Sequence, residues 1–210
     1  MKKHLLAAVV SLGLSSVASA LPIVNGSFET GNLNGWQTSF GPSVYPSSAV
    51  AVHSRTTTNG TVTPTSGSYF AALSGDAYLY QSQTWNAGDS VSFMWNFDGQ
   101  DWFPDYSVLA VLDSNMKQID VITLGSVNST GNAQTGWQSY TYTFANAGSG
   151  YFGFGVANGG DELYNSSLYI DDVTSTIGTP SSVPEPATLA LFGLGLAGLG
   201  FSRRLQNSKK

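Results

Sequence analysis

The sequence contains no cysteine and carries little charge. Only 10% of its 210 residues are charged and only two are histidine. The missing thiols exclude disulfides, thiol catalysis and cysteine-based metal or redox sites. His53 is the only histidine outside the first residues of the chain, and no Gly-x-Ser-x-Gly elbow accompanies it. With one histidine left in the body, a histidine-rich metal site cannot form, and no motif supports a Ser-His-Asp triad.

Basic residues are almost confined to the two ends of the chain. The N-terminal Lys2-Lys3 pair and four residues between Arg203 and Lys210 account for six of the eight. The body between them keeps Arg55 and Lys117 against twelve Asp and Glu residues, a formal net charge of −10. A surface of this sign repels phosphate backbones, which excludes nucleic acid as a partner, and it attracts divalent cations.

Residues 1–20 have the three-part layout of a secretory signal peptide. A basic start, Lys2-Lys3-His4, precedes the apolar run Leu5–Leu14 and the small residues Ala18-Ser19-Ala20. The apolar run is too short to cross a bilayer. The pattern predicts export and cleavage by signal peptidase after Ala20.

The other end of the chain combines a proline-flanked acid, an apolar stretch and an arginine pair. Residues 187–201 are apolar or small, and as a helix they would cover about 22 Å. That length is short for a hydrocarbon core of about 30 Å, although flanking residues can adapt to the difference. The following Arg203 and Arg204 would stay cytoplasmic, so the sequence predicts a single transmembrane helix with the body outside.

The order Pro184-Glu185-Pro186, apolar span, Arg203-Arg204 resembles the PEP-CTERM sorting domain, here over residues 183–206. The resemblance implies a Gram-negative source and an exosortase that cleaves near Pro184-Glu185-Pro186. The precursor would be tethered to the inner membrane and then placed at the cell surface or in the extracellular matrix, alongside biofilm exopolysaccharide. A plain C-terminal anchor is the alternative.

The body, residues 21–174, shows the two-residue alternation of β-strands, and turn signals separate the segments. Many short strands at this spacing predict an all-β, two-sheet sandwich. Residues 175–182, rich in Ser, Thr, Gly and Pro, predict a flexible linker. The predicted strands are Tyr69–Leu73, Tyr78–Trp85, Ser90–Phe97, Ser107–Asp113, Gln118–Leu124, Ser139–Phe144, Tyr151–Val156 and Leu168–Val173.

Two segments of the body resemble the opening and closing segments of jelly-roll carbohydrate-binding modules and galactose-binding-like domains. They are residues 25–36, reading NGSFETGNLNGW, and residues 168–173, reading LYIDDV. The resemblance implies a jelly-roll β-sandwich whose first and last strands are joined by structural Ca²⁺ at Glu29 and Asp171, with backbone carbonyls completing the shell. Strand alternation puts Asp171 and Asp172 on opposite faces, so only one of them is expected at the ion; Asp171 is favoured and Asp172 stays open.

Two groups of residues are candidates for a sugar site. Asp98, Asp101 and Asp105 surround Trp102 and Phe103, so that aromatic rings could stack on a sugar while carboxylates accept bonds from its hydroxyls. There are two alternatives to a sugar site here: a second calcium loop, or an irregular loop that packs Trp102 into the edge of the core. Tyr78 and Tyr80 share one face of a strand and form a second candidate surface, unless they are ordinary strand residues.

The sequence therefore favours an exported, non-catalytic polysaccharide-binding module. One alternative is a structural or adhesive matrix protein without a sugar site. Another is a hydrolase acting on exopolysaccharide, which would need a pair of carboxylates at a suitable separation.

Overall fold

The computed structural model describes residues 22–41, 46–100, 103–127, 133–159 and 164–178, and its compact unit ends at Gly178. The signal peptide and the sorting tail lie outside these residues, as do Asp101 and Trp102. Within the described residues, no helix is long and apolar enough to span a bilayer. The predicted span 187–201 is outside that part of the chain.

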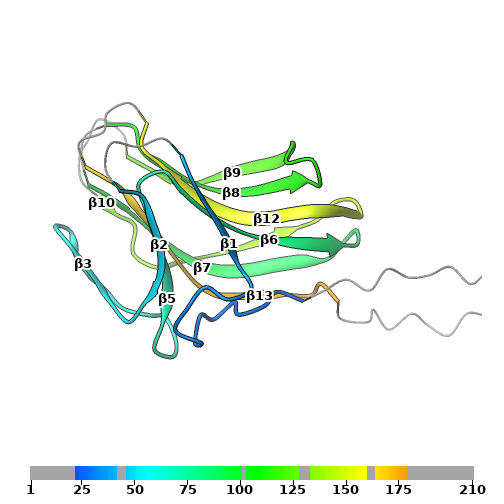
Figure 1. Ribbon diagram of the computed structural model, residues 1–210, viewed down its shortest axis with the longest axis horizontal. Coiled ribbons are helices and arrows are strands. Elements are labelled where there is room, and N and C mark those ends of the chain that lie inside the picture. Colours follow the sequence, from blue (N-terminus) through cyan, green and yellow to red (C-terminus); the bar gives the residue numbers. More distant parts are fainter. Residues whose placement is uncertain (1–21, 42–45, 101–102, 128–132, 160–163, 179–210) are drawn as a thin grey trace, which may run out of the picture. The chain divides into compact units, whose positions relative to one another are not determined.

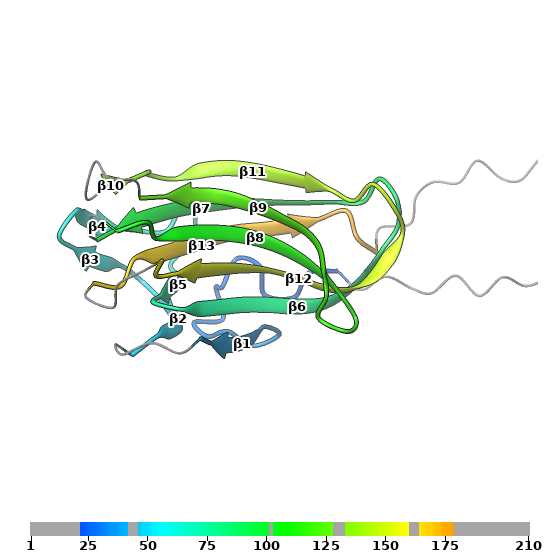
Figure 2. The ribbon, with the colours of Figure 1, turned by 90° about the horizontal axis from the view of Figure 1, so that it is seen from above.

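Two antiparallel sheets face each other, as Figure 1 shows in side view and Figure 2 from above. The all-β sandwich of the jelly-roll kind is confirmed. In sheet A the order is β1 (Gln37–Phe40), β6 (Ala77–Trp85), β12 (Gly148–Ala157), β8 (Tyr106–Asp113), β9 (Gln118–Ser126). In sheet B it is β10 (Ala133–Gln134), β7 (Ser90–Gly99), β13 (Ser167–Ser175), β5 (Phe70–Ser74), β2 (Ser48–Val52), and β11 (Gln138–Thr143) also pairs with β7.

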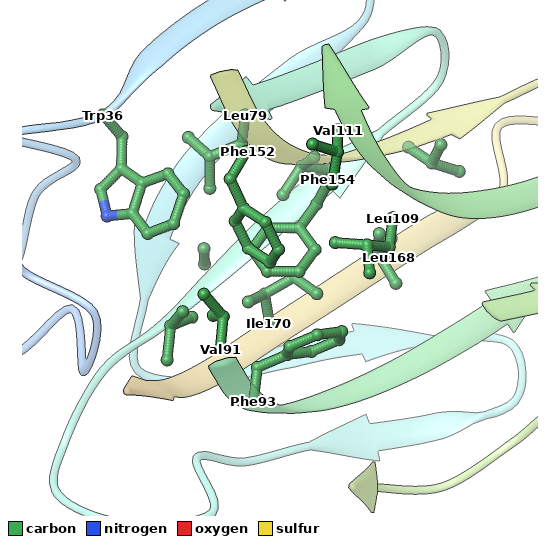
Figure 3. Close-up of a cluster of buried hydrophobic side chains, with 14 of the residues drawn as sticks. Trp36, Leu79, Val91, Phe93, Leu109, Val111, Phe152, Phe154, Leu168 and Ile170 are labelled. Carbon is green, nitrogen blue, oxygen red and sulfur yellow. The ribbon is translucent and has the colours of Figure 1, made fainter. Parts of the chain in front are cut away.

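Each strand predicted from alternation is present, because the alternation marks the face that each strand buries. In β12, Phe152, Phe154 and Val156 are buried, while Gly153 and Gly155 occupy the opposite face. Phe154 packs against Phe93 of β7 with ring centroids 4.8 Å apart. Figure 3 shows such side chains from both sheets meeting in one core. Removing these large aromatic and aliphatic side chains from water is the main source of the attraction between the two sheets.

The segment before β1 has no regular strand but closes one side of the core. Phe28 is completely buried and Trp36 nearly so, and the Trp36 ring lies 6.0 Å from that of Phe154. The Val173 amide of β13 donates to the Gly26 carbonyl at 2.9 Å. The first and last parts of the sandwich therefore lie side by side.

The hairpin of β3 (Arg55–Thr57) and β4 (Gly60–Val62) covers part of the outer face of sheet B. Val62 is buried with Phe70, Ala72 and Tyr169 in a small second core. This cover leaves the outer face of sheet A as the more open of the two faces.

The sandwich continues past residue 174, where the linker was expected to begin. Ile177 is completely buried in the main core, and the Thr176 amide donates to the Ser90 carbonyl at 2.9 Å. The remainder of the expected linker, from residue 179, lies outside the described residues.

Candidate functional site

The outer face of sheet A carries a hollow of about 210 Å³, which we call the tyrosine groove. Strands β6, β12 and β8 form its floor and walls, and the β8–β9 turn reaches its edge. Its lining residues are Ser39, Tyr78, Tyr80, Ala110, Leu112, Met116, Tyr151, Gly153 and Phe154.

Strand register explains why the tyrosines surround a bare floor. Tyr80 lies opposite Gly153 and Tyr78 lies opposite Gly155, so the rings on β6 stand beside positions of β12 without side chains. A methyl group on Gly155 would come 2.6 Å from Cδ1 of Tyr78, which shows that this ring leans over the glycine. The floor is thus low because of glycine, and its sides are aromatic.

Tyr151 completes the aromatic wall from β12. Its ring meets that of Tyr80 edge to face, with centroids 5.6 Å apart. Burial, followed by the nearby Asp76 carboxylate, raises the pKa of Tyr78 above its ordinary value, so this phenol stays protonated at neutral pH. Partly exposed aromatic rings bearing hydroxyls suit a ligand with both apolar faces and hydroxyl groups.

The structure brings Tyr78 and Tyr80 together as expected, but sequence reasoning missed Tyr151 and Met116. The repeat Tyr151-x-Gly153-x-Gly155 marks a face with one ring and two bare positions, and this was the available signal. Sequence alone does not show that this face pairs with Tyr78 and Tyr80, since that depends on the β6–β12 register.

Asp98 is not at the tyrosine groove. It is completely buried on the outer side of sheet B, beneath the β3–β4 hairpin. Its carboxylate accepts hydrogen bonds from the Thr57 hydroxyl and the Asn59 amide, each at 2.6 Å, and from the Tyr169 hydroxyl at 3.3 Å. Burial, and then the Asp98 charge, raises the pKa of Tyr169. This geometry gives Asp98 a structural role and leaves its oxygens inaccessible to a sugar.

Asp105 is also completely buried, and Phe103 is exposed. The Asp105 carboxylate accepts hydrogen bonds from the Gly159 amide at 2.9 Å and from the Ser166 hydroxyl. Phe103 precedes β8 and is 44% exposed. Asp98 and Asp105 are therefore not exposed carboxylates of the kind expected in an acidic cluster around Trp102.

Glu29, Asp171 and Asp172 all bind one loop, residues 65–69. Glu29 accepts the Ser68 and Tyr69 amides at 2.8 Å. Asp171 accepts the amide and the hydroxyl of Thr65 at 2.8 and 2.7 Å, and Asp172 accepts that same hydroxyl at 2.7 Å.

The expectation that Asp171 and Asp172 are separated by strand alternation is wrong. Asp172 has a left-handed backbone with φ of 50°, and β13 has an irregular register between Asp171 and Thr174. These two features turn both carboxylates toward Thr65. Burial raises the pKa of Asp171, although bonds from Thr65 and from the Asp172 amide oppose that rise.

The donor atoms around this loop suit calcium in kind. Calcium binds carboxylates, hydroxyls, backbone carbonyls and water, and the first two meet here. Among the described residues no group of three acidic or histidine side chains is placed to hold a metal. Loop carbonyls and water would have to complete the shell.

A second hollow of about 270 Å³ opens at the edge of the sandwich between β9 and β11. Trp85 and Phe144 stack at its base with centroids 4.5 Å apart. The Tyr142 hydroxyl donates to Asp120 at 3.2 Å, and burial together with this carboxylate raises the pKa of Tyr142 to about 12. Trp85 and Phe144 are almost fully buried, so they offer little surface to a ligand.

Comparison with known proteins identifies the tail. Residues 182–204 match the PEP-CTERM protein-sorting motif. The chain therefore carries the sorting signal of an exported protein that is anchored at its C-terminus before processing. The match includes Pro184, Glu185, Pro186, Arg203 and Arg204. No curated protein matches the chain.

Solved structures similar to the body include a carbohydrate-binding module and an adhesin domain. One is TmCBM61 in complex with β-1,4-galactotriose, 16% identical over 75% of this chain and 99% of that one, with a TM-score of 0.46. Another is the K3 cleaved adhesin domain of Lys-gingipain from Porphyromonas gingivalis. It is 17% identical over 74% of this chain and 99% of that one, with a TM-score of 0.46.

A third similar structure is the enzymatically active domain of tailspike protein 4 of bacteriophage CBA120. It is 15% identical over 73% of this chain, with a TM-score of 0.46, and the match spans only 21% of the tailspike chain. Likenesses at this level of identity concern the fold alone.

Proposed function

We propose that this chain is an exported, non-catalytic polysaccharide-binding protein that holds an extracellular glycan in the tyrosine groove. The main observation behind the proposal is that Tyr78, Tyr80 and Tyr151 surround a floor of glycine on the open face of the sandwich. Binding would combine contact of sugar faces with the rings and hydrogen bonds to phenol and serine hydroxyls.

The groove favours binding over hydrolysis. Glycoside hydrolysis by the usual route needs two carboxylates on either side of the scissile bond. The described lining of the tyrosine groove contains no carboxylate, while Asp98 and Asp105 are buried elsewhere.

Replacing Tyr78 by alanine should weaken glycan binding strongly. Loss of a central aromatic contact typically costs about 2 kcal/mol, which is about 30-fold in affinity. The measurement is calorimetric titration of the full chain with a panel of polysaccharides, in a detergent without a sugar headgroup. Tyr164, 65% exposed and outside the groove, supplies the control Tyr164→Ala. Equal affinity of the two variants for every glycan bound would contradict the assignment.

We further propose that the tail routes the protein through an exosortase after signal peptidase has cut behind Ala20. The precursor would be held in the inner membrane of a Gram-negative cell, and the mature product would join the surface or the exopolysaccharide matrix of a biofilm. Mass spectrometry of the mature protein should find a C-terminus close to Pro184-Glu185-Pro186. A full-length tail in cells with an active exosortase would be inconsistent with this route.

Calcium is the proposed cofactor, bound where Glu29 and Asp171 meet the loop at residues 65–69, with Asp172 as a further candidate ligand. Chelation should lower the melting temperature, since a ligand present at a hundred times its Kd contributes about 3 kcal/mol to stability. The shift on chelation should be much smaller in Glu29→Ala. The relevant comparison is between shifts, because Glu29→Ala also loses its bonds to Ser68 and Tyr69. An equal shift in melting temperature in the two proteins would show that Glu29 is not a calcium ligand.

A self-associating structural protein is the second candidate function. The edge strand β9 exposes Ile119 at 55% and Val121 at 39%, and Met116 in the adjoining turn at 50%. An exposed edge with apolar side chains can pair with another copy. Concentration-dependent assembly without binding to any glycan would favour this function.

A further inference from the structure

The strands of sheet A contain almost no charge. Their described residues include two ionisable carboxylates, Asp113 and Asp120, and no lysine or arginine. Asp113 accepts the amides of Asn115 and Lys117 and so holds the β8–β9 turn. Asp120 accepts the Tyr142 hydroxyl at the edge facing sheet B. The outward positions of sheet A therefore carry hydroxyl, amide, aromatic, aliphatic and glycine groups.

The body of the chain has a formal net charge of −10, and one carboxylate lies beside the tyrosine groove. Asp76 lies close enough to Tyr78 to contribute to the rise in the pKa of that phenol. The body has only two cations, and Arg55 lies in the β3–β4 hairpin on sheet B. Lys117 is the one cation near the groove by sequence, in the turn that also holds Met116. An anionic ligand would thus meet a field of its own sign with a single exposed lysine to oppose it.

Desolvation acts in the same direction as this repulsion. A carboxylate or sulfate that leaves water for a surface of rings and glycine loses hydration, and no guanidinium or ammonium group among the described lining residues replaces it. A neutral sugar loses much less, because its hydroxyls can exchange water for phenol and serine hydroxyls and its apolar face can cover a ring. The difference between these two costs is a basis for specificity.

We propose that the tyrosine groove selects uncharged glycans and rejects uronate-containing, sulfated and phosphorylated chains. This inference rests on the proposed function. It names the ligand class by charge, and it predicts that binding is nearly independent of salt.

The test uses pairs of polysaccharides that differ only in charge. Polygalacturonate and alginate are each compared with their carboxyl-reduced forms, and xylan, galactan and a β-glucan serve as neutral references. The full chain is titrated in detergent without a sugar headgroup at about 20 mM and about 500 mM salt, where the Debye length falls from about 20 Å to about 4 Å. We expect at least one neutral glycan to bind with less than about a twofold change between the two salts, and its acidic counterpart to bind about tenfold more weakly at low salt.

A charge-adding variant sharpens the test. Ser82 is exposed and lies opposite Tyr151 beside the groove. Ser82→Lys should strengthen binding of the acidic member of the pair and leave that of the neutral member within about twofold. Thr61→Lys, an exposed position on β4 in the hairpin over sheet B, is the matched control and should change neither.

The outcomes separate the two proposals. Acidic glycans that bind as tightly as their reduced forms, or more tightly, overturn the selection by charge and leave the groove as a binding site. Failure of every glycan to bind, or binding that is insensitive to Tyr78→Ala, overturns the proposed function and this inference together.

Discussion

Replacing Asp98 by alanine should lower the stability of the domain by about 3 kcal/mol and its melting temperature by about 9 °C. The carboxylate accepts bonds from Thr57, Asn59 and Tyr169 and is completely buried. Its removal takes one acceptor away from each of these donors and weakens the attachment of the β3–β4 hairpin to sheet B, which then depends on the Asn59–Gly99 hydrogen bond and on the packing of Val62. Urea unfolding followed by tryptophan fluorescence measures the loss.

The control for this substitution is Asp120→Ala. The Asp120 carboxylate is only partly buried and accepts a single hydrogen bond, from Tyr142, so its loss should cost no more than about 1 kcal/mol. Glycan affinity should be unchanged in Asp98→Ala under conditions where it is folded. Weakened glycan binding with unchanged stability would instead place Asp98 at the ligand, as its sequence neighbourhood suggested.

Gly26→Ala should be as damaging, for a different reason. A methyl group at Gly26 would come 1.9 Å from the Val173 carbonyl oxygen and 3.2 Å from Cγ2 of Ile23. The segment before β1 would have to move away from β13 and lose the bond from the Val173 amide to the Gly26 carbonyl. We expect a loss of about 3 kcal/mol in the free energy of unfolding.

Gly88→Ala separates this clash from backbone strain. Gly88 has φ of 88° and open space around it, so its substitution costs only the strain of a left-handed residue, about 1 kcal/mol. The two variants are compared by denaturant titration. A loss in Gly26→Ala no larger than that in Gly88→Ala would show that the segment around Phe28 does not dock against β13 as described.

Strands such as β6 could be predicted because one face is buried and the other is not, whereas β5 and β13 are short apolar runs buried on both faces. The sequence pattern did not predict β1, β2, β3, β4 and β10. These strands are short and lie at sheet edges or in the β3–β4 hairpin. The four exposed residues of β1, Gln37–Phe40, show no contrast between faces. Edge strands of this kind are held by pairing with a neighbour, such as β6 for β1, and a neighbour far along the chain leaves no local pattern.

The residues of the tyrosine groove were partly predictable from strand alternation. The shared face of Tyr78 and Tyr80 follows from strand alternation, but their approach to Tyr151 depends on the register of β6 with β12. Asp98 looked like a loop carboxylate because acidic and aromatic residues follow it. It lies instead within β7, and its oxygens accept hydrogen bonds from the β3–β4 hairpin, some forty residues earlier in the chain. Asp172 departed from alternation because its left-handed φ coincides with a register shift inside β13, after which the strand continues to Ser175.

The most direct test of the central claim is to map the ligand onto the protein by nuclear magnetic resonance. The isotopically labelled chain is titrated with the neutral oligosaccharide that binds best in the panel. The account predicts that shift changes concentrate in β6, β12 and β8 and in the rings of Tyr78, Tyr80 and Tyr151. Changes confined to the β3–β4 hairpin, or to the hollow between β9 and β11, would contradict it.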